Sequence, residues 1–126
     1  MEDIITAPIS TEEMLPAVAQ GAIGIERREN DIRIATMLEA IHNSKTGLLL
    51  SAERAFLKAL DGSCETPIAG LAELSNGNLR FRGEILKTDG SEVFSDEQVA
   101  SKDDATLMGV EMAQRLLIKA GNDFFL

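Results

Sequence analysis

A single cysteine is the side chain in this sequence with the clearest capacity for covalent chemistry. Cys64 lies in the stretch LDGSCETPI (residues 60–68), and the chain has no second thiol with which it could form an internal disulfide. A thiolate captures soft electrophiles and forms thioethers. Gly62 favours a turn, which predicts that the thiol lies on a loop, where functional groups are often displayed. The alternative from the local pattern alone is a small, buried and inert side chain.

Two other kinds of chemistry find little support among the remaining residues. His42 is the only histidine, and it follows a predicted helix end without a cluster of ligand residues around it, so we predict no metal site. A thiol redox protein is a weak hypothesis, because there is no resolving cysteine and no Cys-x-x-Cys pair.

Composition narrows the function classes further. The chain has 126 residues, is 44% hydrophobic and 26% charged, and carries a formal net charge of −9. Such a balance is typical of a globular domain and argues against nucleic-acid binding, which needs clustered Lys and Arg. We expect no transmembrane segment, because no apolar run approaches the ~20 residues that span a bilayer. The acidic start is unlike a signal peptide, and a cytoplasmic location is therefore expected.

Residues 44–126 have the pattern of an α+β domain. The spacing of apolar residues predicts a helix over 44–60, beginning at Ser44 or Thr46, and strands over 68–74, 79–87 and 92–100. Asn-Gly-Asn at 76–78 and Asp-Gly at 89–90 are typical of the turns of a β-meander. A last helix is predicted over 105–120, capped by Asp103 or Asp104 and ended by Gly121. This order predicts a three-stranded antiparallel sheet with helices over one face.

Residues 1–43 look like the tail of a larger structure. Short strands are predicted over 3–8 and 22–26, followed by a helix from Asp31 to His42. Neither strand has an obvious partner within the chain, and an isolated strand cannot satisfy its own backbone groups. The predicted division is therefore 1–43, a strand-and-helix remnant of upstream α/β domains, and 44–126. A missing chain or a second copy in a swapped homodimer would supply the partner.

Three segments together resemble the porphobilinogen deaminase (hydroxymethylbilane synthase) family. They are LPAVAQGAIGIERR (15–28), SAERAFL (51–57) and LDGSCETPI (60–68), and the spacing between them also fits. The resemblance covers nearly the whole chain. It implies an enzyme that joins four porphobilinogen molecules head to tail into hydroxymethylbilane, releasing ammonia at each step, in heme and tetrapyrrole biosynthesis.

The resemblance also implies a cofactor and the residues that hold it. The family grows its product on a dipyrromethane cofactor bound through a thioether, and Cys64 matches that cysteine. Arg28 and Arg54 match arginines that face the carboxylates of the cofactor and the growing oligopyrrole, which a guanidinium holds by two points. Their alternative role is that of solvated surface charges. Gln20 and Gly21 match part of an interdomain hinge, with an ordinary turn as the alternative.

Some residues depart from the family pattern. Ala19 stands where the family usually has glycine, which would stiffen the hinge, and Ser63 and Glu65 replace the commoner glycine and glutamine.

The catalytic residues of the family lie upstream of the residues matched here. The chain would then hold no catalytic residue, would need the missing N-terminal domains as its partner, and would be inactive alone. The alternative is a non-catalytic binding or interaction module that keeps the domain fold. Retention of Cys64, Arg28 and Arg54 together favours the first hypothesis.

Overall fold

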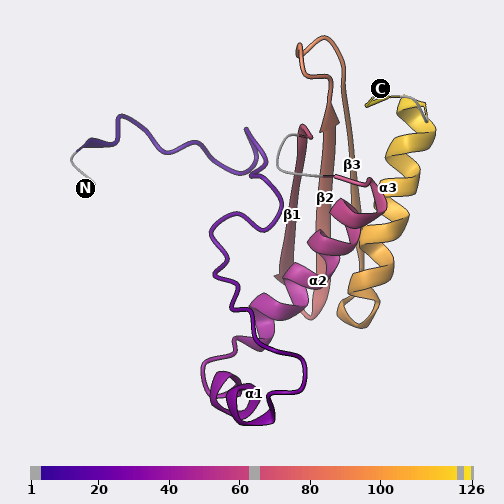
Figure 1. Cartoon of the computed structure of the whole chain (residues 1–126). Coiled ribbons are helices and arrows are strands. Elements are labelled where there is room, and N and C mark those ends of the chain that lie inside the picture. Colours follow the sequence, from indigo (N-terminus) through magenta and orange to yellow (C-terminus); the bar gives the residue numbers. More distant parts are fainter. Residues whose placement is uncertain (1–3, 63–65, 122–123, 126) are drawn as a thin grey trace.

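Two helices cover one face of a three-stranded antiparallel sheet (Figure 1). The computed structural model describes residues 4–62, 66–121 and 124–125. The sheet has the order β1-β2-β3, formed by Ile68–Ser75, Asn78–Leu86 and Val93–Ser101. The covering helices are α2, Ser44–Ala59, and α3, Ala105–Ala120, which follows a short 3₁₀ turn at Lys102–Asp104. The predicted α+β class and the predicted order of elements after residue 44 are confirmed.

Local chemistry explains where these elements begin and turn. Asn43 caps α2 by accepting a hydrogen bond from the backbone N–H of Thr46 at 2.9 Å. Between β1 and β2, Asn76 and Gly77 have φ values of 52° and 81°, the left-handed pair that a tight hairpin requires. Gly121, with φ of 92°, ends α3 as predicted.

The core lies between the sheet and the helix pair, and one aromatic ring organises its centre. Phe56 of α2 is fully buried and packs edge-to-face on Phe81, with ring centroids 5.3 Å apart. Its ring lies over Gly70 and Gly83, which are paired across β1 and β2. A Cβ at Gly83 would lie 3.0 Å from the Phe56 ring. The two glycines therefore form the space that the ring fills.

The two covering helices approach each other closely at Gly109 of α3. A Cβ built there would lie 2.1 Å from the carbonyl oxygen of Ala52 and 2.8 Å from the backbone nitrogen of Phe56. Because both contacts are with backbone, the spacing of α2 and α3 depends on the absence of a side chain at this position.

The N-terminal third differs from its prediction. Residues 4–8 and 22–26 form no strand, so the two expected strands are not present in the part of the chain that the structure describes. A strand needs a partner for its backbone groups, and within residues 4–31 only Ala17 makes an isolated bridge, with Ala69. The helix α1, Ile32–Glu39, is present but ends earlier than expected. It lies apart from the sheet (Figure 1), and none of its residues is buried.

Candidate functional site

The loop that carries Cys64 begins at a well-defined helix end. Leu60 caps α2, and Asp61 adopts a left-handed conformation with φ of 52°. The backbone N–H of Asp61 donates to the carbonyl of Lys58 at 3.1 Å, and that of Gly62 donates to the carbonyl of Leu57 at 2.9 Å. This pair of bonds is a Schellman motif, which fixes the direction in which the chain leaves α2.

Gly62 has a different role from the one expected. The left-handed residue of this turn is Asp61, whereas Gly62 is not among the residues with positive φ. A Cβ at Gly62 would lie 2.6 Å from the Cδ1 atoms of both Leu57 and Ile68. A side chain at residue 62 would therefore displace the ends of Leu57 and Ile68, and the left-handed conformation is adopted one residue earlier.

The far end of the loop is attached to the sheet. The backbone N–H of Leu86, at the end of β2, donates to the carbonyl of Pro67 at 3.0 Å, and that of Ile68 donates to Thr66 at 2.8 Å. Cys64 itself lies outside the described residues, together with Ser63 and Glu65. The structure therefore gives the two anchors of the loop, on α2 and on β2.

Arg54 and Arg28 lie at different places. Arg54 is on the exposed side of α2, ten residues before Cys64 in the sequence, and its Nη2 atom is 3.6 Å from the position of a Cβ on Gly24. It makes no ion pair with any residue that the structure describes. The side chain of Arg28 is 90% exposed, and its Nη2 atom is 3.5 Å from Asp31. The two arginines line separate pockets, so the described residues do not bring them together.

The predicted hinge residues form a turn beside the edge of the sheet. The backbone N–H of Gln20 donates to the carbonyl of Ala17 at 3.0 Å, and Gln20 itself is exposed. Gly21 has φ of 78°, and Ala19, with φ of 61°, also adopts the left-handed conformation. An alanine in this region is strained, because its Cβ crowds the following carbonyl.

Glu53, a buried carboxylate next to Arg54, was missed by sequence reasoning. It is 6% exposed and accepts hydrogen bonds from the backbone N–H groups of Ala19 and Ala72. The position of Glu53 in the sequence could have indicated that it is buried. Glu53 is four residues after Leu49 and three before Phe56, so it lies on the apolar stripe of α2. A charge on such a stripe indicates a buried partner.

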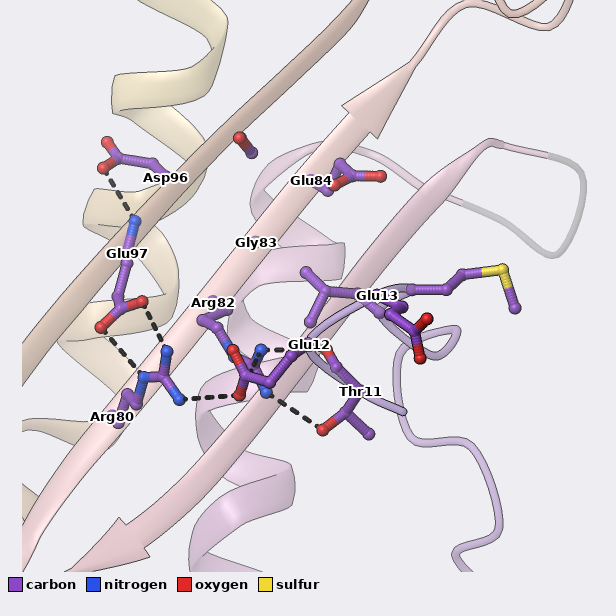
Figure 2. Close-up of a pocket in the computed structure, with 12 residues that line it drawn as sticks. Thr11, Glu12, Glu13, Arg80, Arg82, Gly83, Glu84, Asp96 and Glu97 are labelled. Carbon is purple, nitrogen blue, oxygen red and sulfur yellow. Dashed lines mark hydrogen bonds and ion pairs between the residues drawn. The ribbon is translucent and has the colours of Figure 1, made fainter. Parts of the chain in front are cut away.

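A second charged cluster lies on the sheet face opposite the helices. Figure 2 shows a pocket of about 330 Å³ there, between β2, β3 and residues 11–15. Arg82 of β2 is 8% exposed and lies in this cluster beside Arg80. The sequence carried no signal for its burial, because alternating polar residues on a strand are typical of a solvated face.

The described residues offer a free donor group suited to a carboxylate ligand. Arg54 leaves its guanidinium exposed and unpaired among the described residues, on the helix that leads into the Cys64 loop. Within the same residues, no cluster of acidic, His or Cys side chains has the geometry to hold a metal ion. Nor is any described helix long and apolar enough to cross a bilayer.

Two family models match the chain. Residues 48–118 match the model described as "Porphobilinogen deaminase, C-terminal domain". Residues 1–36 match the model described as "Porphobilinogen deaminase, dipyromethane cofactor binding domain". The first match ends within α1 and the second begins within the first turns of α2, so residues 37–47 lie between them.

Curated relatives match almost the whole chain. Porphobilinogen deaminase of Paracoccus denitrificans is 52% identical over 125 residues, and that of Nitrobacter hamburgensis is 42% identical over 125 residues. The chloroplastic enzyme of Pisum sativum is 44% identical over 128 residues. Each match covers 99% of this chain but only 40%, 40% and 35% of the relative, in the same order. With its C-terminal domain matched over the sheet and both covering helices, the chain belongs to the porphobilinogen deaminase family.

Proposed function

We propose that this chain is the C-terminal portion of a porphobilinogen deaminase, a transferase that joins four porphobilinogen molecules into hydroxymethylbilane and releases ammonia. In this proposal Cys64 forms the thioether to the dipyrromethane cofactor. Arg54 and Arg28 hold carboxylates of the cofactor and of the growing oligopyrrole. The chain spans about 40% of the length of the bacterial relatives named above, so the activity requires the remaining portion.

One observation carries the proposal. The only cysteine of the chain follows the Schellman motif at the end of α2 and precedes the bond between Pro67 and Leu86, so the described residues on both sides of it are fixed. Functional groups are often carried on segments that connect the elements of a rigid scaffold. The exposed Arg54 lies on α2, the helix that precedes Cys64, and a guanidinium is suited to binding a carboxylate, which supports the proposal.

The thiol and the guanidinium groups have complementary tasks. When bound, the cofactor supplies the pyrrole to which further units are added. A thiolate captures a pyrrole-methylene cation as a soft electrophile, and the resulting thioether is stable. Arginine binds acetate and propionate groups through a planar fork, which would explain an anion site within a chain of net charge −9.

Exposed apolar side chains in the N-terminal third support an interaction with a large partner. Nine large apolar side chains in residues 4–41 are more than half exposed: Ile4, Ile5, Ile9, Met14, Ile23, Ile25, Ile32, Met37 and Ile41. Such a density of exposed apolar surface is typical of an interaction face. In this proposal the face packs against the upstream portion of the enzyme. A second copy of the chain is the other hypothesis, and light scattering of the purified chain separates the two because a dimer has twice the mass.

A mass measurement tests the role of Cys64. Trypsin cleaves after Lys58 and Arg80 and releases one peptide, residues 59–80, that contains the cysteine. We expect this peptide to carry a mass increase equal to the dipyrromethane group when the chain is produced together with the upstream portion of the Paracoccus denitrificans relative. The Cys64→Ser variant should show no increase. An adduct on another peptide, or an unmodified thiol, would contradict the assignment.

A chimaera tests the activity. We expect no turnover of porphobilinogen by the chain alone, and turnover when the upstream portion of the same relative is fused before it. Cys64→Ser in the chimaera should abolish activity without unfolding the protein, whereas Lys45→Gln, on the exposed surface of α2 and outside the pocket that Arg54 lines, should leave it active. Turnover by the chain alone, or an active Cys64→Ser chimaera, would refute the proposal.

A further inference from the structure

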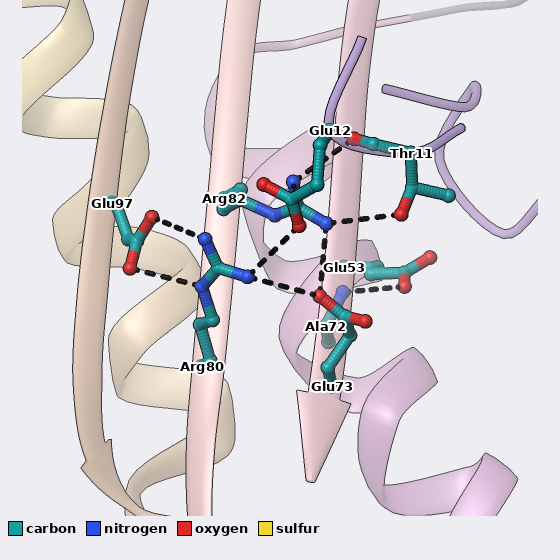
Figure 3. A network of polar contacts seen from close by, with 8 residues as sticks. All are labelled: Thr11, Glu12, Glu53, Ala72, Glu73, Arg80, Arg82 and Glu97. Carbon is teal, nitrogen blue, oxygen red and sulfur yellow. Dashed lines mark hydrogen bonds and ion pairs between the residues drawn. The ribbon is translucent and has the colours of Figure 1, made fainter. Parts of the chain in front are cut away.

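Two buried charged residues stand out in the part of the chain that the structure describes. Glu53 is 6% exposed and Arg82 is 8% exposed, and no other charged residue described is buried. Both contact the same extended segment, residues 10–19, which we call the strap. Figure 3 shows Arg82 reaching Thr11 and Glu12 across the open face of the sheet, with Glu53 beneath β1. Burying a charge is costly unless it is paired, so both side chains have a specific task.

Glu53 holds the C-terminal end of the strap at the edge of the sheet. Its Oε2 atom accepts a hydrogen bond of 2.7 Å from the backbone N–H of Ala19, and its Oε1 atom accepts one of 2.9 Å from that of Ala72 in β1. Between these contacts, the backbone N–H of Gly70 donates to the carbonyl of Pro16 at 3.0 Å. The strap and Glu53 together satisfy groups of β1 that an open sheet edge would expose.

Arg82 holds the N-terminal end of the strap on the outer face. Its Nη1 atom donates to the carbonyl of Thr11 at 2.9 Å and lies 3.0 Å from Oε1 of Glu12. Its Nη2 atom lies 2.9 Å from Glu73 of β1, which fixes the guanidinium from the side of the sheet. Arg80 adds a weaker contact to Glu12 at 3.2 Å. The buried guanidinium therefore joins the strap to two strands.

No residue of the strap is fully buried. Val18 packs against the core and Leu15 and Pro16 are half-buried, whereas Met14 is 61% exposed. Ser10 and Glu13 form a single capped turn that is internal to the strap. A segment attached mainly by polar contacts, with little buried apolar surface, opens at a lower free energy than the core.

We propose that Glu53 and Arg82 form a two-point clamp, and that the strap releases from it as a unit while α2, the sheet and α3 stay folded. Ala19, the strap residue that Glu53 holds, and the following Gly21 both have the left-handed conformation, so the chain pivots at this end of the strap. Opening would free the edge of β1 and change the orientation of the preceding chain relative to the domain. The inference rests on the contacts of the strap and is independent of the proposed enzymatic activity.

The release of the strap can be tested by native-state amide hydrogen exchange of the 126-residue chain, measured by NMR at low urea concentrations. The reporters are the amides of Ala19 and Gly70, which donate to Glu53 and to the strap. A local opening exposes little surface, so we expect their exchange to be nearly independent of urea, whereas amides of the central strand β2 should depend on it strongly. If the exchange of Ala19 and Gly70 depends on urea as strongly as that of the β2 amides, the proposal is overturned.

Variants test the clamp itself. Glu12→Gln, at a side chain that is 66% exposed, removes the ion pairs of the strap without changing a buried group. We expect about three- to tenfold faster exchange at both reporters, including the distant Ala19, with unchanged rates in β2. Arg82→Gln and Glu53→Gln should have larger effects of the same pattern.

The matched control is Glu92→Gln, the same chemical change at an exposed carboxylate that has no ion pair among the described residues and lies outside the pocket that the strap lines. It should leave both reporter amides unaffected. Unchanged exchange at Ala19 in Glu12→Gln would refute the two-point clamp, even if the buried variants fail to fold.

Discussion

Replacing Gly109 by alanine sets two physical effects against each other. In an exposed helix this change stabilises by about 1 kcal/mol, because alanine has the higher helix propensity. Here the new Cβ would lie 2.1 Å from the carbonyl oxygen of Ala52, 2.8 Å from the backbone nitrogen of Phe56 and 3.0 Å from Cβ of Ala55. Ordinary contacts need about 3.5 Å, so α2 and α3 must separate by roughly 1 Å.

The free-energy cost of separating the two helices would exceed the gain from the higher helix propensity of alanine. Overpacking of a core typically costs about 1–3 kcal/mol, and the upper part of that range applies because backbone atoms cannot rotate away. The free energy of unfolding of Gly109→Ala should therefore fall by about 2 kcal/mol in spite of the better helix former. With a urea dependence of about 2 kcal/mol per molar, the midpoint of unfolding moves down by about 1 M.

The assay is urea unfolding followed by far-ultraviolet circular dichroism, with Gly47→Ala as the matched control. Gly47 is also a helical glycine, but a Cβ there would meet the ring of the exposed His42 at 2.9 Å, and that side chain can turn aside. The control should be stabilised by about 0.5 kcal/mol. If Gly109→Ala is as stable as the wild type, the absence of a side chain at residue 109 does not determine the spacing of α2 and α3.

Three further predictions follow from local geometry. Asp61→Gly should raise the free energy of unfolding by up to about 1 kcal/mol in urea titrations, because glycine relieves the left-handed C-cap of α2. Ala19→Gly should relieve the same strain beside the clamp and slow exchange of the amide of residue 19 in NMR, and faster exchange would contradict this explanation. Burial raises the pKa of Asp96, but bonds from Lys119 and the backbone of Glu97, with the charge of Arg115, outweigh it and leave the pKa below its usual value. The ionised Asp96 carboxylate therefore stabilises the folded chain fully above the unfolded pKa of about 3.9, and this stabilisation is lost as the pH falls below that value. In acid unfolding, the free energy of unfolding of Asp96→Asn should fall less over that pH range than that of the wild type.

Helices and strands after residue 44 followed from local patterns. Apolar spacing predicted α2 and α3 to within two residues at their ends, and the Asn-Gly turn predicted the hairpin between β1 and β2. These elements are encoded by residues close together in sequence, so the pattern is sufficient. The strands predicted in residues 3–8 and 22–26 were wrong over the described residues, because a strand depends on a partner that a local pattern does not supply.

For the candidate site, the sequence determined the residue types, and the tertiary structure decided their surroundings. Cys64, Arg28 and Arg54 were proposed from short motifs, and their role as site residues stays a prediction. The attachment of Pro67 to β2, the separation of the two arginines and the clamp formed by Glu53 and Arg82 were not predictable in this way. Each depends on contacts between residues far apart in the chain, such as the 34 positions between Ala19 and Glu53 and the 71 between Thr11 and Arg82. A hydrogen bond over such a separation forms only after the sheet and helices have brought its two groups together, and no local pattern specifies it.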